Sequence, residues 1–438
     1  MRHLVLPLAL VGTLSFFTMA TASADVQGAE SGGGGPGAPI GGNNEDPSIL
    51  LNEIQVRRAQ RDSLLGVSPL KSLHDATDQA KDSIYQASHL KLGLNINHLF
   101  QWLSEALPDN DKWGTTTDLD FVGSWELLNR GEPTQGELFF GVEGRWSYGT
   151  TGPQNLGFVS LASQIGTANA FSEYRPAFIL RNLYWEQGSK EAGWAYRVGK
   201  ITPDAILATS KHITPVTTFL PNAGTGLFSS GYPDSGLGAV GVWYPNDRWR
   251  ILGLVSDANA DRFDFGCPGC GDYYYALELG YKIAPRTQQA GYSKFTIWHN
   301  DGTRNGEPIN ASTGKEGWGM TAKLEQELTD DGDAIGILRW GKSWDDSSLY
   351  EQQVGLHFLL YDPPGPAGMQ NDLIGIAGNW AKATAEGARD EYNVEVFYRF
   401  PLFTGLDTTL SYQSVINPAL TREIDHASVF SLRLRAVF

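Results

Sequence analysis

The last ten residues of the chain constrain its fold more than any other segment. Between Val429 and Phe438 the sequence reads VFSLRLRAVF, in which apolar and polar side chains alternate. The apolar positions are Phe430, Leu432, Leu434, Ala436 and Phe438, and the polar positions are Ser431, Arg433 and Arg435. A period of two places these two sets on opposite faces of a β-strand. One apolar face and one charged face fit the last strand of a transmembrane β-barrel, although a strand of a soluble sandwich has the same period.

The start of the chain indicates export. Arg2 precedes an apolar run that ends at Phe17, and Ala22-Ser23-Ala24 follows, so residues 1–24 are predicted to be a signal peptide. No stretch approaches the about 18 uninterrupted apolar residues of a membrane-spanning helix. Residues 25–47 are rich in Gly and Pro and are predicted to be a disordered leader. Residues 48–88 show helical spacing of apolar side chains, which predicts two short helices that lie in the periplasm or in the barrel mouth.

The composition agrees with a barrel and argues against other classes. Mean hydropathy is −0.26, yet the chain has 13 Trp and 17 Tyr. Lipid-facing strands hide their hydrophobicity by alternation, and Trp and Tyr gather at membrane interfaces. A secreted sugar-binding sandwich has a similar composition. The formal charge of −16 argues against nucleic acid as a partner.

From residue 89 to residue 438 the alternation repeats about sixteen times, each time over about ten residues, the length of a tilted membrane-spanning strand. The fold class predicted is all-β, an antiparallel transmembrane β-barrel with a short N-terminal helical segment. The predicted strands are 90–103, 115–127, 136–147, 178–187, 192–200, 236–245, 248–258, 272–283, 290–299, 316–327, 334–344, 349–361, 371–382, 389–400, 405–415 and 428–438.

The connections between these segments alternate in length. Long connections such as 148–177 and 201–235 follow odd-numbered strands, and short turns such as Gly188 to Glu191 follow even-numbered strands. A barrel with both ends in the periplasm has this pattern, because its outer loops are long and its inner turns short. The stretch 362–370 is long for an inner turn and is the exception.

A barrel of about sixteen strands encloses water, so its selectivity requires a constriction. The connection 201–235 is the candidate, because it is too long for a hairpin and carries apolar residues that favour folding inward over lying outside as a surface loop. A sugar path needs an aromatic ring for the CH face of a sugar, and charged side chains for its hydroxyls. The candidates on and beside this connection are Arg181, Trp185, Arg197, Lys200, Asp204 and Trp243; a Trp near a strand end is also typical of a membrane-interface anchor.

The two cysteines, Cys267 and Cys270, lie in the segment FGCPGCGD. In an exported protein this pair is predicted to form a disulfide at a loop tip. A zinc site would need two further ligands, and no His lies nearby in the sequence, so we expect no metal. GxSxG and HExxH motifs do not occur in the sequence, so we also expect no enzyme activity and no cofactor.

Several segments together resemble the carbohydrate-selective porin (OprB) family, over roughly residues 90–438. They are FILRNLYWEQGSKEAGWAYRVGKITPD (178–204), GLGAVGVWYPNDRWRILGLVSDAN (236–259), YYYALELGYKI (273–283), GWGMTAKLEQEL (317–328), NDLIGIAGNW (371–380), NVEVFYRF (393–400) and NPALTREIDHASVFSLRLRAVF (417–438). The family's pattern in the penultimate strand is kept only at Gln413, Asn417 and Pro418, and residues before the fourth predicted strand diverge.

The resemblance implies passive diffusion of mono- and oligosaccharides through the outer membrane, without a cofactor. Lipid and lipopolysaccharide are then expected partners of the outer face, and a homotrimer is one candidate assembly. The alternatives are an exopolysaccharide exporter, a porin for other small solutes, and a structural protein of the envelope. The sequence leaves open whether residues 48–88 plug the pore.

Overall fold

The computed structural model describes residues 40–59, 63–108, 111–148, 178–283, 287, 290–363 and 372–438. The predicted signal peptide and most of the predicted leader lie outside these residues. So do the connection after the third strand and most of the stretch 362–370.

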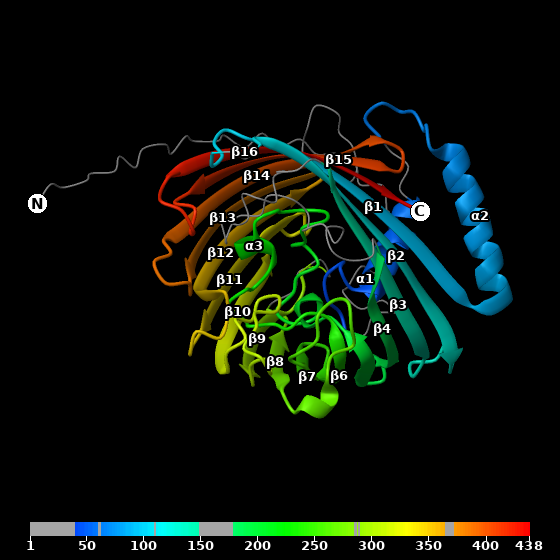
Figure 1. The fold of residues 1–438 in the computed structure, drawn as a ribbon. Helices are drawn as coiled ribbons and strands as arrows, with labels where there is room; N and C mark the ends of the chain where they lie inside the picture. Colours follow the sequence, from blue (N-terminus) through cyan, green and yellow to red (C-terminus); the bar gives the residue numbers. More distant parts are fainter. Residues whose placement is uncertain are drawn as a thin grey trace, which may run out of the picture. The chain divides into compact units, whose positions relative to one another are not determined.

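Sixteen antiparallel strands close into one barrel (Figure 1), which confirms the predicted fold class. Closure occurs between the first and last strands, where Asn95 is opposite Val437 and Leu103 is opposite Val429. Every predicted strand is present, with ends that differ by at most three residues. The strands are β1 (Leu90–Leu103), β2 (Trp113–Leu128), β3 (Gly136–Tyr148), β4 (Phe178–Ser189), β5 (Trp194–Ile201), β6 (Gly236–Asn246), β7 (Trp249–Asp257), β8 (Tyr273–Tyr281), β9 (Ser293–Asn300), β10 (Gly317–Glu327), β11 (Ala334–Ser343), β12 (Tyr350–Tyr361), β13 (Leu373–Ala383), β14 (Asp390–Phe403), β15 (Leu406–Ile416) and β16 (His426–Val437).

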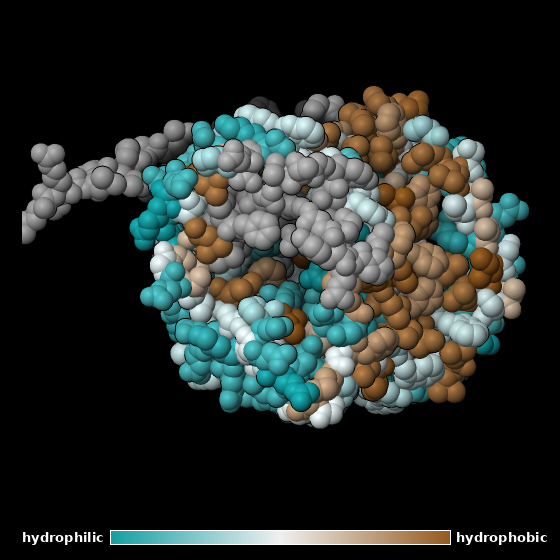
Figure 2. Space-filling view, in the orientation of Figure 1, coloured by the Kyte–Doolittle hydropathy of each residue, from teal (hydrophilic) through white to brown (hydrophobic). Residues whose placement is uncertain are grey.

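The outer face of the barrel is apolar. Large side chains such as Leu277, Leu324 and Val198 are about half exposed there, while their neighbours along each strand are buried inside. Figure 2 shows hydrophobic residues gathered over a broad area of one side of the molecule. In hydrocarbon every backbone N–H and C=O must be paired, and a closed sheet achieves this without leaving an edge.

Aromatic residues gather near both ends of the strands on this outer face. At one end Trp102 is opposite Trp113 and next to Phe430, and at the other end Trp194 is opposite Trp243. Two such girdles are typical of barrels whose strands cross a membrane.

The described residues before the barrel form two helices, α1 (Pro47–Ala59) and α2 (Lys71–Ser88). Helix α1 lies against the inner faces of β1, β2 and β3, whereas α2 lies outside the barrel beside β1 (Figure 1). Contacts near both of its ends hold α2 against the barrel. The ring of His74 stacks on that of Phe438 with the ring centroids 4.7 Å apart, and the Trp125 indole donates to the Ser88 carbonyl. No helix in the described part of the chain is long and apolar enough to cross a membrane.

Residues 40–46 precede α1 and also lie inside the barrel, so the predicted disorder of the leader does not extend to them. Ile40 is fully buried, and the backbone N–H of Asn43 donates to the Ala205 carbonyl at 3.0 Å. Gly42 allows this approach, because a Cβ there would lie 2.5 Å from the same carbonyl oxygen. Asp46 ends the segment and caps α1, since its carboxylate accepts from the Ser48 N–H while Pro47 is the first helical residue.

The connection 201–235 folds into the barrel, as predicted, and not outward. It includes the 3-10 turn Pro203–Ala205 and the short helix α3 (Asn222–Thr225). Charged side chains of the inner wall hold its backbone: Arg433 donates to the Pro215 and Thr218 carbonyls, Lys323 to Thr209, and Glu278 and Glu395 accept from the N–H groups of Ala208 and Leu220. Inward-pointing charges therefore satisfy loop groups that would otherwise be buried unpaired.

Candidate functional site

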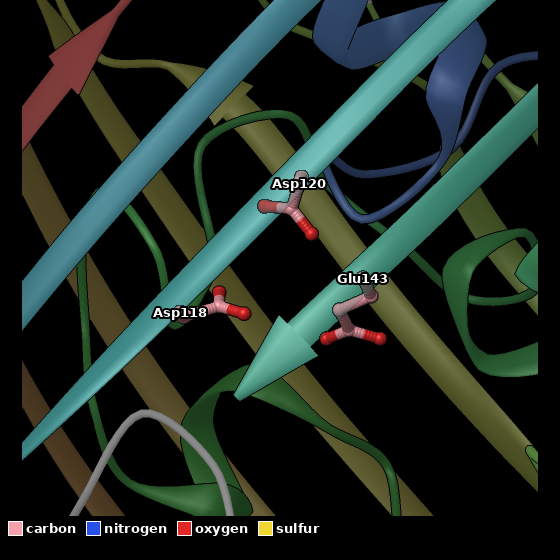
Figure 3. Close-up of side chains that lie close together, drawn as sticks. All are labelled: Asp118, Asp120 and Glu143. Atoms are coloured by element: carbon pink, nitrogen blue, oxygen red, sulfur yellow. The ribbon is translucent and has the colours of Figure 1, made fainter. Parts of the chain in front are cut away.

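The inner faces of β2, β3 and β4 carry a dense group of charged side chains. Asp118 and Asp120 follow each other on the inner face of β2, and Glu143 and Arg145 lie opposite them on β3. Arg181 of β4 donates to Glu143 at 3.1 Å, and Arg145 also pairs with Glu143. The three carboxylates point toward one another (Figure 3). We call Asp118, Asp120, Glu143, Arg145 and Arg181 the wall cluster.

The folded loop presents charges of its own toward Arg181. Asp204 lies in the 3-10 turn and accepts a hydrogen bond from the Asn310 amide at 3.2 Å. Burial raises the pKa of Asp204; Arg181 opposes this effect and Asp234 adds to it. Burial opposes ionisation of Asp234 as well, but the guanidinium groups of Arg262 and Arg181 outweigh it and lower the pKa of Asp234. Arg262 donates to Asp234 at 2.9 Å.

Glu45, in the segment before α1, belongs to the same electrostatic group. Burial, which Arg181 partly offsets, raises the pKa of Glu45 to about 7, and the charges of Asp204 and Glu143 contribute to the rise. Its charge therefore changes near neutral pH. The wall cluster, the loop acids and Glu45 together form a surface of alternating sign, which can exchange hydrogen bonds with the hydroxyls of a neutral polar solute.

Two further candidates from the sequence, Arg197 and Lys200, face the lumen but are fully engaged. Lys200 is 1% exposed and donates to the carbonyls of Arg262 and Asp264, so it fixes the connection after β7. Arg197 is completely buried; it donates to Glu186 at 2.8 Å and to Asp46, and it lies 3.9 Å from the centre of the Tyr184 ring. Lys200 and Arg197 therefore hold other segments in place, and their charged groups are not free to bind a solute.

Arg197 fastens the N-terminal segment inside the barrel. Its partner Asp46 also accepts from the Tyr184 hydroxyl at 2.8 Å. Further along α1, Glu53 pairs with Arg435 and Arg57 with Asp407. We call residues 40–59 the lumen segment, because it contacts the inner wall at points from Ile40 to Arg57.

Trp185 and Trp243 lie outside the pore lining. Trp243 is 57% exposed on the outer face, opposite Trp194. Trp185 follows Tyr184, which bonds Asp46 in the lumen, so the Trp185 side chain points the other way and covers Gly136. Both residues are near the short turns, where aromatic side chains anchor a barrel at the membrane interface. The sequence-based placement of these two residues in the sugar path is therefore not supported.

Sequence reasoning did not assign Asp118, Asp120 or the lumen segment to the site. The signal was present for Glu143 and Arg145, whose alternation with apolar neighbours places them on the inner face of β3. Alternation gives the face of a side chain but not its partners across the lumen.

Cys267 and Cys270 form a disulfide in the connection between β7 and β8, with Cα atoms 5.4 Å apart. Cys267 precedes the 3-10 turn Pro268–Cys270 and Cys270 is its last residue; none of the three residues of the turn is buried. The Arg304 guanidinium donates to the Cys270 sulfur at 3.3 Å. The pair is remote in sequence from the wall cluster.

Comparisons with known proteins agree with this geometry. A family model described as carbohydrate-selective porin, OprB family, matches residues 129–438. Among solved structures, the high-pH structure of Pseudomonas putida OprB aligns with a TM-score of 0.65 at 11% identity, covering 83% of this chain and 97% of that one. Its low-pH structure aligns with a TM-score of 0.51 at 10% identity, covering 83% and 96%. A comparison with curated protein sequences found no match.

Proposed function

Because the chain belongs to the carbohydrate-selective porin (OprB) family, and is a sugar-selective porin of the outer membrane, we propose that sugars pass along the wall cluster. On one side the path is bounded by β2, β3 and β4. On the other side it is bounded by the folded loop 201–235, which carries Asp204 and Asp234. The chain's family and its fold are those of a transport channel.

The distribution of charges on the inner wall carries this proposal. Around β8 to β16, residues such as Arg433, Lys323 and Glu395 are occupied by the backbone of the folded loop. In the wall cluster the charges instead face one another and the side chains of Asp204 and Asp234. Side chains that pair with other side chains can exchange a partner for a sugar hydroxyl without unfolding the loop.

Liposome swelling tests the solute class. Vesicles that contain the protein are diluted into glucose, sucrose or an amino acid of similar size. We expect faster swelling with the sugars, because their hydroxyls both donate and accept hydrogen bonds, whereas the two charged groups of an amino acid cost more to desolvate in the constriction. Equal rates for sugars and amino acids would favour the general porin. A sugar titration of single-channel conductance then measures binding, and conductance that no sugar alters would contradict a binding path.

The proposal also covers the export of the chain, the boundaries of its segments and its assembly. We propose that residues 1–24 direct export and are removed, that residues 25–47 are a leader whose last residues, 40–46, dock inside the barrel, that residues 48–88 are a helical segment, and that residues 89–438 are the porin domain. N-terminal sequencing of the protein from outer membranes should begin at Asp25. The apolar outer face supports contact with lipid and lipopolysaccharide, and the mass of the detergent-solubilised protein distinguishes a homotrimer from a single barrel.

A further inference from the structure

Three carboxylates of the wall cluster are spaced as ligands of one ion. One oxygen each of Asp118, Asp120 and Glu143 lies within 4.8 Å of the others. Ca²⁺ binds oxygen ligands at about 2.3–2.6 Å, so three oxygens this close to one another can all reach one ion. Mg²⁺ demands near-ideal octahedral geometry and keeps several of its waters, whereas Ca²⁺ accepts an irregular set of carboxylate and amide oxygens, so the ligand set favours Ca²⁺.

A fourth side chain beside these acids lacks a partner. Asn97 of β1 is fully buried, and neither its amide nitrogen nor its amide oxygen has a hydrogen bond. The register places Asn97 directly opposite Asp118, and its neighbour Asn95, on the same face, donates to Asp120 at 2.8 Å. Asn97 therefore lies on the same inner face as the acids, between Asp118 of β2 and Arg435 of β16. A buried amide without a partner is costly, and an amide oxygen is a usual ligand of Ca²⁺.

The charges of the cluster also remain unbalanced. Asp120 is directly opposite Glu143, and like charges in that position repel each other. Both arginines pair with Glu143, and Arg145 Nε also lies 3.6 Å from Oδ1 of Asp118, an ion pair that leaves this buried oxygen without a hydrogen bond. The wall cluster has three acids against two arginines, and Glu45, which interacts with Arg145 and Arg181, adds a further negative charge when it is ionised. A divalent cation would offset this excess of negative charge.

We propose that Asp118, Asp120, Glu143 and Asn97 bind a Ca²⁺-type divalent cation on the inner wall of the barrel. The ion bridges β1, β2 and β3, satisfies the Asn97 amide oxygen and coordinates the Asp118 oxygen that lacks a hydrogen bond. Water completes its coordination on the lumen side, as is usual for Ca²⁺. All the proposed ligands lie on strands of the barrel wall, so binding of the ion does not depend on which solute passes through the pore.

Calorimetric titration of the purified full-length protein with CaCl₂, after treatment with EDTA, tests the site. We expect one saturable Ca²⁺ site for each chain and weaker binding of Mg²⁺. The double variant Asp118→Asn/Asp120→Asn should lose at least about tenfold in affinity, because charged ligands set Ca²⁺ affinity. The matched control is Asp345→Asn/Asp346→Asn, which removes two acids from an exposed outer connection and should bind Ca²⁺ as the parent does.

Absence of saturable binding in the parent protein, or equal affinity in parent and double variant, overturns the proposal. Two single variants keep the test decisive if the double variant does not fold. Glu143→Gln removes a ligand charge and should weaken binding, whereas Asn97→Asp adds a ligand charge and should tighten it by about tenfold. Unchanged affinity in both variants would again exclude this site.

Discussion

The contact between Asp46 and Arg197 gives the sharpest test of how the lumen segment is held. Arg197 has two buried carboxylate partners, Asp46 from the lumen segment and Glu186 from the wall. Replacing Asp46 by Asn removes one charged partner and leaves the other. A hydrogen bond to a charged group contributes about 1.5–3 kcal/mol, so we expect the docked state to lose about 2–3 kcal/mol. That loss shifts the equilibrium between docked and undocked segment by about 30- to 150-fold.

Single-channel recording in planar bilayers measures this shift. In the Asp46→Asn variant we expect excursions to a higher-conductance state to become more frequent by about that factor, because the undocked segment no longer fills part of the lumen. The Glu53–Arg435 and Arg57–Asp407 pairs still hold α1, so the docked state remains the main one.

The matched control is Glu186→Gln. It removes an equally buried charge from the same arginine but leaves the contact with the lumen segment intact. Its conductance should resemble that of the parent protein. If the two variants give the same distribution of conductances, the reasoning that Asp46 holds the segment in the pore is refuted.

Three further predictions follow from the site. The pKa of Glu45 is raised to about 7, so this carboxyl is neutral below about pH 7 and gains a negative charge above it; the cation preference measured as a reversal potential in a salt gradient should therefore rise across this range, and Glu45→Gln should abolish the rise. Arg181→Ala should weaken sugar block of the current by about 10- to 100-fold, since charged hydrogen bonds are lost, whereas Trp185→Ala on the outer face should leave the block constant unchanged; the opposite ranking would place the path elsewhere. The disulfide between Cys267 and Cys270 predicts that the purified protein reacts with a maleimide only after reduction, and that Cys267→Ser/Cys270→Ser keeps the β-sheet circular dichroism of the parent protein, because the bond lies in a connection outside the sheet; labelling without reductant would show that the thiols are free.

The misplacement of Trp185 shows where alternation fails. Arg181 and Trp185 are four residues apart and would share a face in a regular strand. The pairing of β3 with β4 shifts between Gly141 and Val142, and the extra residue brings both Arg181 and Asn182 to the inner side. Beyond this bulge the parity is reversed, so that Tyr184 faces inward and Trp185 outward. A bulge depends on the partner strand and has no signature in the sequence of β4 alone.

Trp243 was misplaced for a different reason. The residues that alternate with it, Val240, Val242 and Tyr244, are also apolar, so the pattern of β6 does not distinguish its two faces. They face inward because the lumen segment and the folded loop supply them with an apolar contact. If the lumen at this position were polar, these three residues would be expected to face lipid and Trp243 to face inward.

The sequence alone determined the barrel. Period-two alternation, the parity of long and short connections and the apolar side chains of residues 201–235 are local properties, and each strand expresses them without reference to its partners. The tertiary structure alone decided which charges meet. Asp46 and Arg197 are 151 residues apart, and Glu53 and Arg435 are 382 residues apart. Such pairs form only when closure of the sheet and docking of α1 bring distant segments together, since the energy of a buried charge depends on the partners around it and not on its neighbours in the chain.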